Sequence, residues 1–352
     1  MSSVASFAGT PALHVSEYHG SPHAWDEFVR RQRGWTHYHL YRWRDVIHAV
    51  HRHDCPYLVA RTDDGALAGV LPLVRLRSVV FGHYLVSMPF LNYGGPLGSD
   101  AAVAALGAYA AERARREDAT LLELRSRHAC ALDLPVSHRK VTSLLDFPEG
   151  GSSALWASFS SRLRNRVRRA QKSGLEVRFG ADQVDPFFEV FSRHMRDLGT
   201  PTQPRRFFRE IASTFPDDVT FGCGYVNGQL ASCGCGFTWN GEFEMSWASA
   251  LRAFDHAKPN MGMYWAFMER LADAGIRTFN FGRSTPGSGT HAFKQHWGAR
   301  DEPLWWYDVS RDGQAITPSP QQGTYAWGVK LWQRVPVPVA TAAGPYIVRY
   351  IP

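Results

Sequence analysis

The sequence predicts a mixed α/β fold made of two similar units in tandem, each with a central mixed sheet flanked by helices. The chain has 352 residues, of which 44% are hydrophobic and 13% aromatic, enough to fill the cores of two ordinary domains. The same order of helix and strand patterns occurs twice along it. Between the copies the segment PEGGSS, residues 148–153, interrupts both periodicities, so we place the boundary of the units there.

The first unit is assigned to residues 1–150. Apolar residues at helical spacing predict a helical stretch at 25–50, and alternating apolar runs then predict strands. Asp63, Asp64 and Gly65 mark a turn between two of these strands. The elements that follow the first helical stretch are strands at 57–61, 66–76 and 79–87, a helix at about 100–116 and a strand at 121–126.

The second unit is assigned to residues 151–312 and repeats this order. Two Asn-Gly pairs, at 227–228 and 240–241, separate alternating apolar runs and predict two hairpins. The predicted elements are a basic helix ending near Lys172, a strand at 175–179, helices at 186–198 and 205–215, strands at 219–226, 229–239 and 242–249, a helix at 259–274 and a strand at 276–281. Residues 313–352 form a C-terminal tail without a clear period, which we expect to pack on the surface or to contact a membrane.

Composition limits the kind of partner and the compartment. The net charge of +7 and the isoelectric point near 9.3 favour an anionic partner. No run of apolar residues is long enough to span a membrane, and the N-terminus lacks a secretory signal, so we expect a cytoplasmic protein. Five cysteines without a CxxC pair fit reduced thiols. We expect no metal and no tightly bound cofactor, although His48, His51 and His53 lie close together in sequence.

The segment 279–298, FNFGRSTPGSGTHAFKQHWG, is the strongest indication of a site. A buried strand runs into a glycine-rich loop that carries Arg283, Ser284 and Lys294. Loops at strand ends are where α/β proteins commonly bind ligands, and glycines allow the backbone to approach a ligand closely. We therefore predict that Arg283 and Lys294 bind anionic groups or polarise a reacting carbonyl. The alternative is a solvated loop whose cations pair with Asp301 or Glu302.

Glu244 is the candidate general base. It shares a strand with Ser246 and alternates with Met245 and Trp247, so it occupies an apolar sequence in which burial would raise its pKa. The alternative is an exposed carboxylate on an edge strand.

Further residues are candidates for binding the donor or the acceptor. Pro259 suits the first position of a helix, and Asn260 and Gly262 in its first turn would leave backbone N–H groups free for a phosphate. Aromatic residues near the site would shape an acceptor pocket or belong to the core. The complete set is Asn92, Tyr93, Arg162, Arg166, Trp247, Ser249, Asn260, Gly262, Tyr264, Ser284 and Trp297.

Several segments together carry a family resemblance: NYGGPL, SRLRNRVRRAQKSGLEV, EMSWASA, KPNMGMYW and the segment 279–298. With the order of elements, they resemble the Fem-type branch of the GNAT acyltransferase superfamily, and more narrowly the FemAB-like proteins associated with exosortase/PEP-CTERM and exopolysaccharide systems. The resemblance implies two tandem GNAT-like units and a base on the central strand. It also implies transfer of an acyl or aminoacyl group from an acyl-CoA or aminoacyl-tRNA to an amine of a cell-envelope or exopolysaccharide precursor or other small acceptor.

One feature of the Fem family is missing, and two other functions stay open. The sequence shows no long heptad-bearing arm of the kind that some Fem enzymes insert in the second unit. One alternative is a non-catalytic RNA-binding module that uses the basic helix 160–172, and another is a degenerate scaffold of the same fold that binds polysaccharide. The sequence does not fix the oligomeric state.

Overall fold

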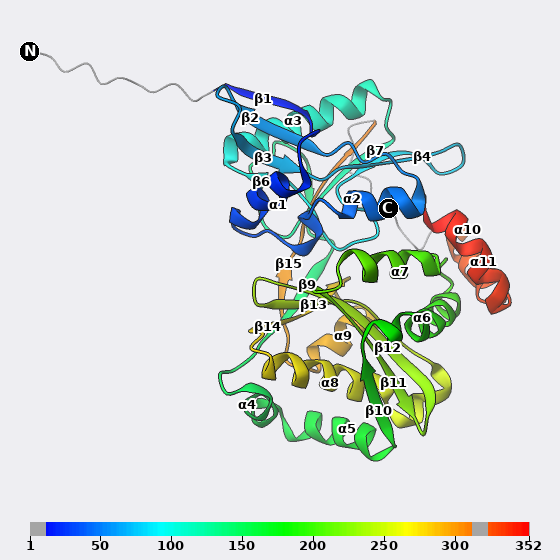
Figure 1. Ribbon diagram of the computed structural model, residues 1–352. Helices are drawn as coiled ribbons and strands as arrows, with labels where there is room; N and C mark the ends of the chain where they lie inside the picture. The colour runs from blue at the N-terminus through cyan, green and yellow to red at the C-terminus, as the bar shows by residue number, and fades with distance from the viewer. Residues whose placement is uncertain (1–11, 312–322, 352) are drawn as a thin grey trace, which may run out of the picture.

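The computed structural model describes residues 12–311 and 323–351, which form two lobes stacked one on the other (Figure 1). The upper lobe and the strand that leaves it contain β1 (Leu13–Glu17), α1 (Pro22–Arg31), η1 (His37–His39), α2 (Trp43–His51), β2 (Leu58–Thr62), β3 (Leu67–Leu71), β4 (Val74–Ser78), β5 (Gly82–Val86), β6 (Leu97–Gly98), α3 (Asp100–Arg116), β7 (Leu121–Ser126), β8 (Val136–Ser137) and β9 (Val141–Asp146).

The lower lobe follows the same plan. Its elements, with those after it, are α4 (Gly151–Ser158), α5 (Ser161–Lys172), β10 (Leu175–Phe179), η2 (Ala181–Gln183), α6 (Val184–Leu198), α7 (Arg205–Thr214), β11 (Val219–Val226), β12 (Gln229–Trp239), β13 (Glu242–Ala250), η3 (Arg252–Ala257), α8 (Pro259–Asp273), β14 (Thr278–Ser284), α9 (Gly289–Gln295), β15 (Arg300–Pro303), β16 (Trp305–Ser310), α10 (Gly323–Trp332) and α11 (Val337–Val348).

Both lobes contain one parallel strand pair joined by a helix, as the predicted duplication requires. In the upper lobe β5 and β7 are parallel and α3 connects them; in the lower lobe β13 and β14 are parallel and α8 connects them. The other strand pairs are antiparallel, and those of β4 with β5, β11 with β12 and β12 with β13 are hairpins. Both predicted Asn-Gly turns are present, with positive φ at Asn227, Gly228, Asn240 and Gly241.

The lobes exchange a strand. β9 precedes the predicted boundary at residue 150, yet it pairs with β14 and β15 in the seven-stranded sheet of the lower lobe, whose order is β10-β11-β12-β13-β14-β9-β15. β16 comes from the end of the second unit and pairs with β7 in a sheet of the upper lobe, whose order is β4-β5-β7-β16-β8. A division of the chain at residue 150 therefore cuts across two sheets.

Other differences from the predicted elements follow from backbone chemistry. The predicted helical stretch 25–50 is divided into α1, η1 and α2, and Gly34 adopts a positive φ in the interruption. The predicted strand 66–76 is divided at Pro72, which has no N–H for a ladder hydrogen bond, so β3 and β4 belong to different sheets. Residues 79–81 form an exposed hairpin tip instead of strand. The described part of the tail forms α10 and α11, and residues 313–322 lie outside the described residues.

One aromatic core joins the two lobes. It combines side chains from α1, η1 and α2 with others from α6, α7 and β11–β13. Trp43 and Phe237 are both buried from solvent, and the ring of His37 stacks on Phe237 with a centroid distance of 4.5 Å. Because this core is continuous, the loops of the upper lobe keep a fixed position over β13 and β14.

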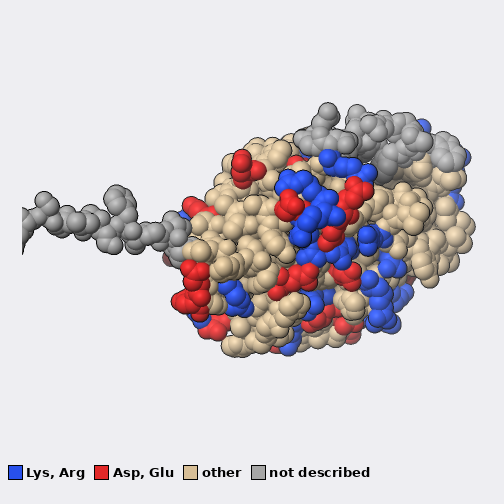
Figure 2. Space-filling view, turned by 90° about the horizontal axis from the view of Figure 1, so that it is seen from above, with Lys and Arg blue, Asp and Glu red and all other residues tan. Residues whose placement is uncertain are grey.

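Charge on the upper lobe is largely balanced. Figure 2 shows Lys and Arg interleaved with Asp and Glu in a band across the face seen from above. Ion pairs in this lobe include Arg75 with Glu117 at 2.5 Å and Arg113 with Glu17 at 2.6 Å. Despite the net charge of +7, this face is therefore not a continuous basic surface. None of the helices in the described part of the chain combines the length and the hydropathy that a membrane span requires.

Candidate active site

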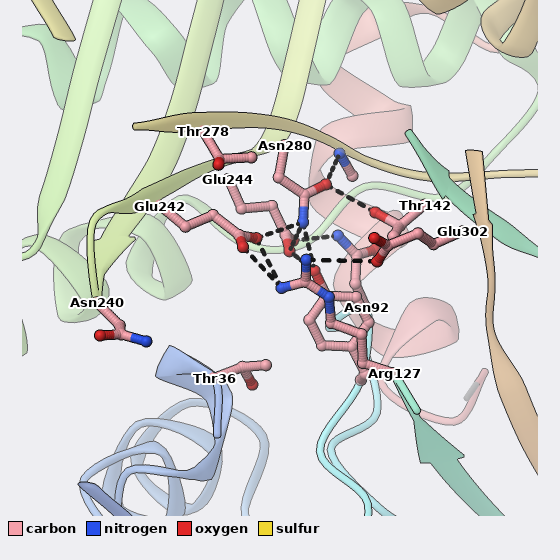
Figure 3. Close-up of polar contacts among 12 residues, drawn as sticks. Thr36, Asn92, Arg127, Thr142, Asn240, Glu242, Glu244, Thr278, Asn280 and Glu302 are labelled. Carbon is pink, nitrogen blue, oxygen red and sulfur yellow. Dashed lines mark hydrogen bonds and ion pairs between the residues drawn. The ribbon is translucent and has the colours of Figure 1, made fainter. Parts of the chain in front are cut away.

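The candidate site lies where β13 and β14 separate. The two strands pair only from Glu242 with Thr278 to Glu244 with Asn280, although both continue further. Ser246 has no partner on β12, because the register shifts there, and it forms a bulge in β13. The parting of the strands opens the sheet beside Glu244, and loops of the upper lobe cover this point (Figure 3).

Glu244 is fully buried and both of its carboxylate oxygens are occupied. Oε1 accepts hydrogen bonds from Tyr38 Oη at 2.5 Å and from Asn92 Nδ2. Oε2 accepts from Tyr93 Oη and, at 3.3 Å, from Asn280 Nδ2. The alternative of an exposed edge-strand carboxylate is thus wrong, because β13 is central in its sheet. Asn92 and Tyr93, which are among the predicted binding residues, contact Glu244 directly.

The electrostatics of Glu244 suit proton transfer. Burial raises the pKa of the Glu244 carboxyl, and the hydrogen bonds from Tyr38, Tyr93 and Asn92 oppose that rise. Tyr38 Oη also lies 2.7 Å from Ser246 Oγ, and Ser246 is partly exposed. The route Ser246, Tyr38, Glu244 therefore connects the buried carboxylate with the bulge.

A second layer of polar contacts fixes this arrangement. Arg127 Nη1 donates to both oxygens of Glu242 at 2.8 Å, and Asn280 Nδ2 donates to Glu242 Oε1 at 2.8 Å (Figure 3). Thr142 Oγ1, on β9, donates to Asn280 Oδ1 at 2.7 Å. Residues from both lobes and from the exchanged strand therefore hold one network.

Lys294 is buried against the end of β14. Its Nζ donates to the carbonyl oxygens of Gly282 at 2.6 Å and Arg283 at 3.0 Å. Burial lowers the pKa of the Lys294 amine to about 7; Glu244 opposes this shift and Arg283 adds to it. Gly282 permits the geometry, since its φ is +72° and a Cβ there would meet the Met245 carbonyl oxygen at 3.0 Å.

Arg283 lies beside a group of paired arginines. Its guanidinium carbon is 5.0 Å from the centroid of the Trp306 ring, which Arg125 and Arg139 also approach. Arg125 and Arg139 both form ion pairs with Glu123. Among the described residues Arg283 forms no such ion pair, although the charges of Glu123 and Glu244 act on it. Burial, together with Arg125, lowers the pKa of Arg283 to about 10.

Salt bridges of Arg283 and Lys294 with Asp301 or Glu302, the alternative to a ligand site, are absent within the described residues. Asp301 instead contacts His291 at 2.6 Å, and Glu302 contacts Arg127 and Arg300. The alternative of a solvated loop with ordinary ion pairs is therefore wrong for Lys294, which is buried.

A cavity of about 420 Å³ lies at the N-terminus of α8. Helix α8 begins without a side-chain cap, and the Oδ1 atom of Asn260 is buried without a hydrogen-bond partner among the described residues. Cations surround this helix end, where free N–H groups favour an anion. The lining residues are Arg166, Arg169, Ala250, Asp255, Lys258, Pro259, Asn260, Met261, Phe293 and His296.

The other predicted binding residues lie outside these two places. Gly262 is not in the cavity lining; a Cβ there would meet Leu175 Cδ2 at 2.2 Å, so this glycine allows α8 to pack closely. Tyr264 and Trp297 belong to an aromatic cluster with Phe281. The remaining positions are Trp247, packed against α7, Ser249 and Ser284, both buried, and Arg162, exposed on α5.

Sequence reasoning missed five residues of the network: Tyr38, Arg127, Thr142, Glu242 and Asn280. Asn280 had a usable signal, a polar residue between two phenylalanines of a buried strand. Tyr38 and Arg127 had none, because their positions depend on the docking of the lobes. Within the described residues, no group of three or more His, Cys, Asp or Glu side chains could hold a metal ion.

Comparisons with known proteins support the predicted fold. Residues 157–295 match the family model described as an acetyltransferase (GNAT) domain. Three solved structures resemble the chain over most of its length: FemX (15% identity, 83% of this chain and 96% of that chain, TM-score 0.60), the C-terminal domain of a putative lysylphosphatidylglycerol synthetase from Agrobacterium fabrum (12%, 88% and 94%, 0.53) and a tandem GNAT protein from the clavulanic acid biosynthesis pathway (14%, 87% and 100%, 0.51). A comparison with curated protein sequences found no match.

These findings confirm the tandem GNAT fold and the Fem-type resemblance. At such low identities the structural likeness establishes architecture, and the domain match covers residues 157–295, less than half of the chain. None of the comparisons supports the RNA-binding or scaffold alternatives.

Proposed function

We propose that this chain is an N-acyltransferase that transfers an acyl group from a phosphopantetheine thioester to an amine. The observation that carries the proposal is the position of the buried Glu244 where β13 and β14 separate, with Lys294 hydrogen-bonded to the end of β14. The charge of Glu244 acts on both Lys294 and Arg283. The guanidinium of Arg283, a lysine with a pKa of about 7 and a carboxylate with a raised pKa are groups that acyl transfer needs.

The position of the cationic cavity supports an acyl-CoA donor. Ala250 lines the cavity and lies six residues beyond Glu244 on β13, which corresponds to roughly 20 Å of strand. A phosphopantetheine arm is a long flexible chain with phosphates at one end and the thioester at the other. With its phosphates in the cavity, such an arm would extend along the opening between the strands toward Glu244. In aminoacyl-tRNA, by contrast, the ester and the terminal phosphate are close together. We therefore favour acyl-CoA and keep aminoacyl-tRNA as the second donor.

The reaction follows from these positions. The neutral acceptor amine attacks the thioester carbonyl, a C–N bond forms, and the C–S bond breaks to release the thiolate of CoA. Lys294 and Arg283 stabilise the negative charge that develops on the carbonyl oxygen. The proton lost by the amine passes by way of Ser246 and Tyr38 to Glu244, because the carboxylate itself is closed to solvent.

The proposed acceptor is an amine of a cell-envelope or exopolysaccharide precursor or another small molecule. Two considerations support it: the resemblance to Fem-type proteins and the structural likeness to a lysylphosphatidylglycerol synthetase domain, whose name indicates a lipid product. Arg283, which forms no ion pair with a described residue, would suit an acceptor that carries an acidic group.

A donor screen tests the proposal. Acyl-CoA thioesters should raise the melting temperature of the protein, because a ligand that binds only the folded state stabilises it by mass action. Radiolabelled acyl groups should then transfer to an amine acceptor. Stabilisation by aminoacyl-tRNA, with no effect of any CoA thioester, would reverse the order of the donors. If neither donor class bound, the scaffold alternative would replace the enzyme.

The cavity makes a separate prediction for donor affinity. Replacing both Arg166 and Arg169 with Ala should weaken CoA binding at least about thirtyfold, since each of the two charge-assisted hydrogen bonds contributes about 1–3 kcal/mol. Titration calorimetry with CoA measures the change. Lys172→Ala is the matched control, because Lys172 is exposed on the same helix and is not in the cavity lining. Equal loss in the control would show a general effect of helix charge and argue against a phosphate site.

A further inference from the structure

Exposed apolar side chains of this protein gather in two places. Nine large hydrophobic residues are exposed among the described residues, and seven of them belong to the tip of the β4–β5 hairpin or to the C-terminal segment 328–351. At the tip, Val79 is fully exposed, Val80 is 84% exposed and Phe81 follows directly. Three consecutive apolar residues in water are unusual for a hairpin turn, where polar residues normally occur.

Helix α11 is apolar on its outer face as well as on its inner face. Ala340 and Gly344 are buried, and Gly344 packs against the backbone of Thr202. On the opposite side Val339, Ala342 and Tyr346 are exposed, at the spacing of one helix face. The helix contains no charged residue. We expected the tail to pack on the surface or to contact a membrane. Packing on the surface explains the apolar residues on the inner face of α11 but not those on its outer face.

The hairpin tip and the C-terminal segment adjoin each other. Phe81 and Tyr350 stack with a centroid distance of 6.2 Å, although they are far apart in sequence. Figure 1 shows the β4 hairpin and helices α10 and α11 on the same side of the molecule. The two apolar groups thus form one surface, which we call the apolar edge: residues 79–81, Leu331, Val339, Tyr346 and Ile351.

Positive charge accompanies the apolar edge. Arg77, Lys330 and Arg334 are exposed beside the apolar residues. The chain from 313 to 352 contains one Lys and two Arg and no Asp or Glu. This combination of protruding apolar side chains and flanking cations fits the boundary of an anionic bilayer, where apolar groups enter the acyl region and cations stay among the headgroups.

We propose that the apolar edge binds the surface of a membrane that contains anionic lipids. A projecting tip of three residues suits insertion between lipids better than contact with a second copy of the chain, which requires broad matched surfaces. The inference does not depend on the proposed acyl transfer, because binding to a bilayer needs no donor and no reaction.

Sedimentation with lipid vesicles tests this proposal. The full chain should sediment with vesicles of equimolar phosphatidylglycerol and phosphatidylcholine, less with pure phosphatidylcholine, and less at high salt. The triple variant Val79→Ser, Val80→Ser, Phe81→Ser should bind at least about tenfold more weakly, because its tip buries less apolar area. The double variant Val339→Ser, Tyr346→Ser should be weakened in the same direction.

A matched control lies at the far side of the same sheet. Val136 is also exposed, but β8 is at the edge opposite β4, so Val136→Ser should bind vesicles like the wild type. All substitutions are at exposed positions, and unchanged thermal unfolding would confirm that the variants fold. The proposal is overturned if the wild type does not sediment with anionic vesicles, or if Val136→Ser weakens binding as much as the tip variant. Light scattering that shows a dimer lost in the tip variant would assign the apolar edge to self-association instead.

Discussion

Replacing Lys294 with Met is expected to lower kcat about 10²- to 10³-fold while the protein stays folded. The side chain of Met fills nearly the same space but supplies no charge and no hydrogen bond. Loss of one group that stabilises the developing oxyanion has an effect of this size in acyl transfer. The measurement is steady-state turnover of the acyl donor with a saturating amine, beside circular dichroism of both proteins.

The low pKa of Lys294 gives this prediction a pH dependence. Since the protonated amine is the active form, kcat should fall as the pH rises through about 7, where Lys294 loses its proton. Lys294→Arg is the matched variant, because guanidinium keeps its charge far above that pH. In Lys294→Arg the decrease of kcat at alkaline pH should occur at a higher pH than in the wild type, even if the maximal kcat is lower. An alkaline limb that is the same in both proteins would assign it to another group, and turnover of Lys294→Met within a few-fold of wild type would remove Lys294 from the mechanism.

Stability should respond to the same substitution. The pKa of Lys294 is about 7 in the folded protein and about 10.4 in an unfolded chain, so the unfolded state binds more protons between these pH values. The wild type should therefore gain stability relative to Lys294→Met as pH rises from about 7 to about 10. Urea unfolding at the two ends of this range measures the difference. Lys294→Met is thus expected to lose activity, while the wild type pays for Lys294 in stability at the lower end of this pH range. This combination is expected of a buried cation that serves function and not of one that stabilises the fold.

The sequence predicted this site in part because its polar residues interrupt local patterns. Lys294 and Arg283 follow a buried strand in a glycine-rich segment, and Glu244 lies in an apolar one, so each was visible from neighbours in sequence. The tandem fold was predictable for the same reason, since Asn-Gly turns and alternation are local signals.

What could not be predicted depends on contacts between distant segments. Tyr38 reaches Glu244 across 206 residues, and Asn92 across 152, because the aromatic core docks η1 and the loop after β5 over β13. The exchange of β9 and β16 is equally non-local, since β9 pairs with β14 and β15 of the lower lobe and β16 pairs with β7 of the upper lobe. The bulge at Ser246 changes the face on which Trp247 lies, and no period of two could reveal that.

Glu244→Gln is expected to lower kcat by about 10²-fold or more and to destabilise the fold by about 1–3 kcal/mol. An amide cannot take the proton of the amine, and general bases contribute effects of this size. The amide NH₂ would also face donors, because Tyr38, Asn92, Tyr93 and Asn280 all donate to the carboxylate, and a buried donor without an acceptor costs about 1–3 kcal/mol. Turnover is measured well below the melting temperature of the variant, so that unfolding does not contribute.

Tyr38→Phe separates the role of Glu244 as proton acceptor from its role as the acceptor of buried hydrogen bonds that stabilise the fold. This substitution removes the hydroxyl that links Glu244 to Ser246 and leaves the carboxylate with three donors, so stability should change less than in Glu244→Gln. If the proton travels by this route, kcat of Tyr38→Phe should fall at least about tenfold. The kcat of Tyr38→Phe should still fall at low pH, as that of the wild type should, because protonation of Glu244, whose pKa is raised, removes the base. If both variants instead keep full turnover below their melting temperatures, Glu244 and Tyr38 serve only to hold the lobes together, and another group must accept the proton.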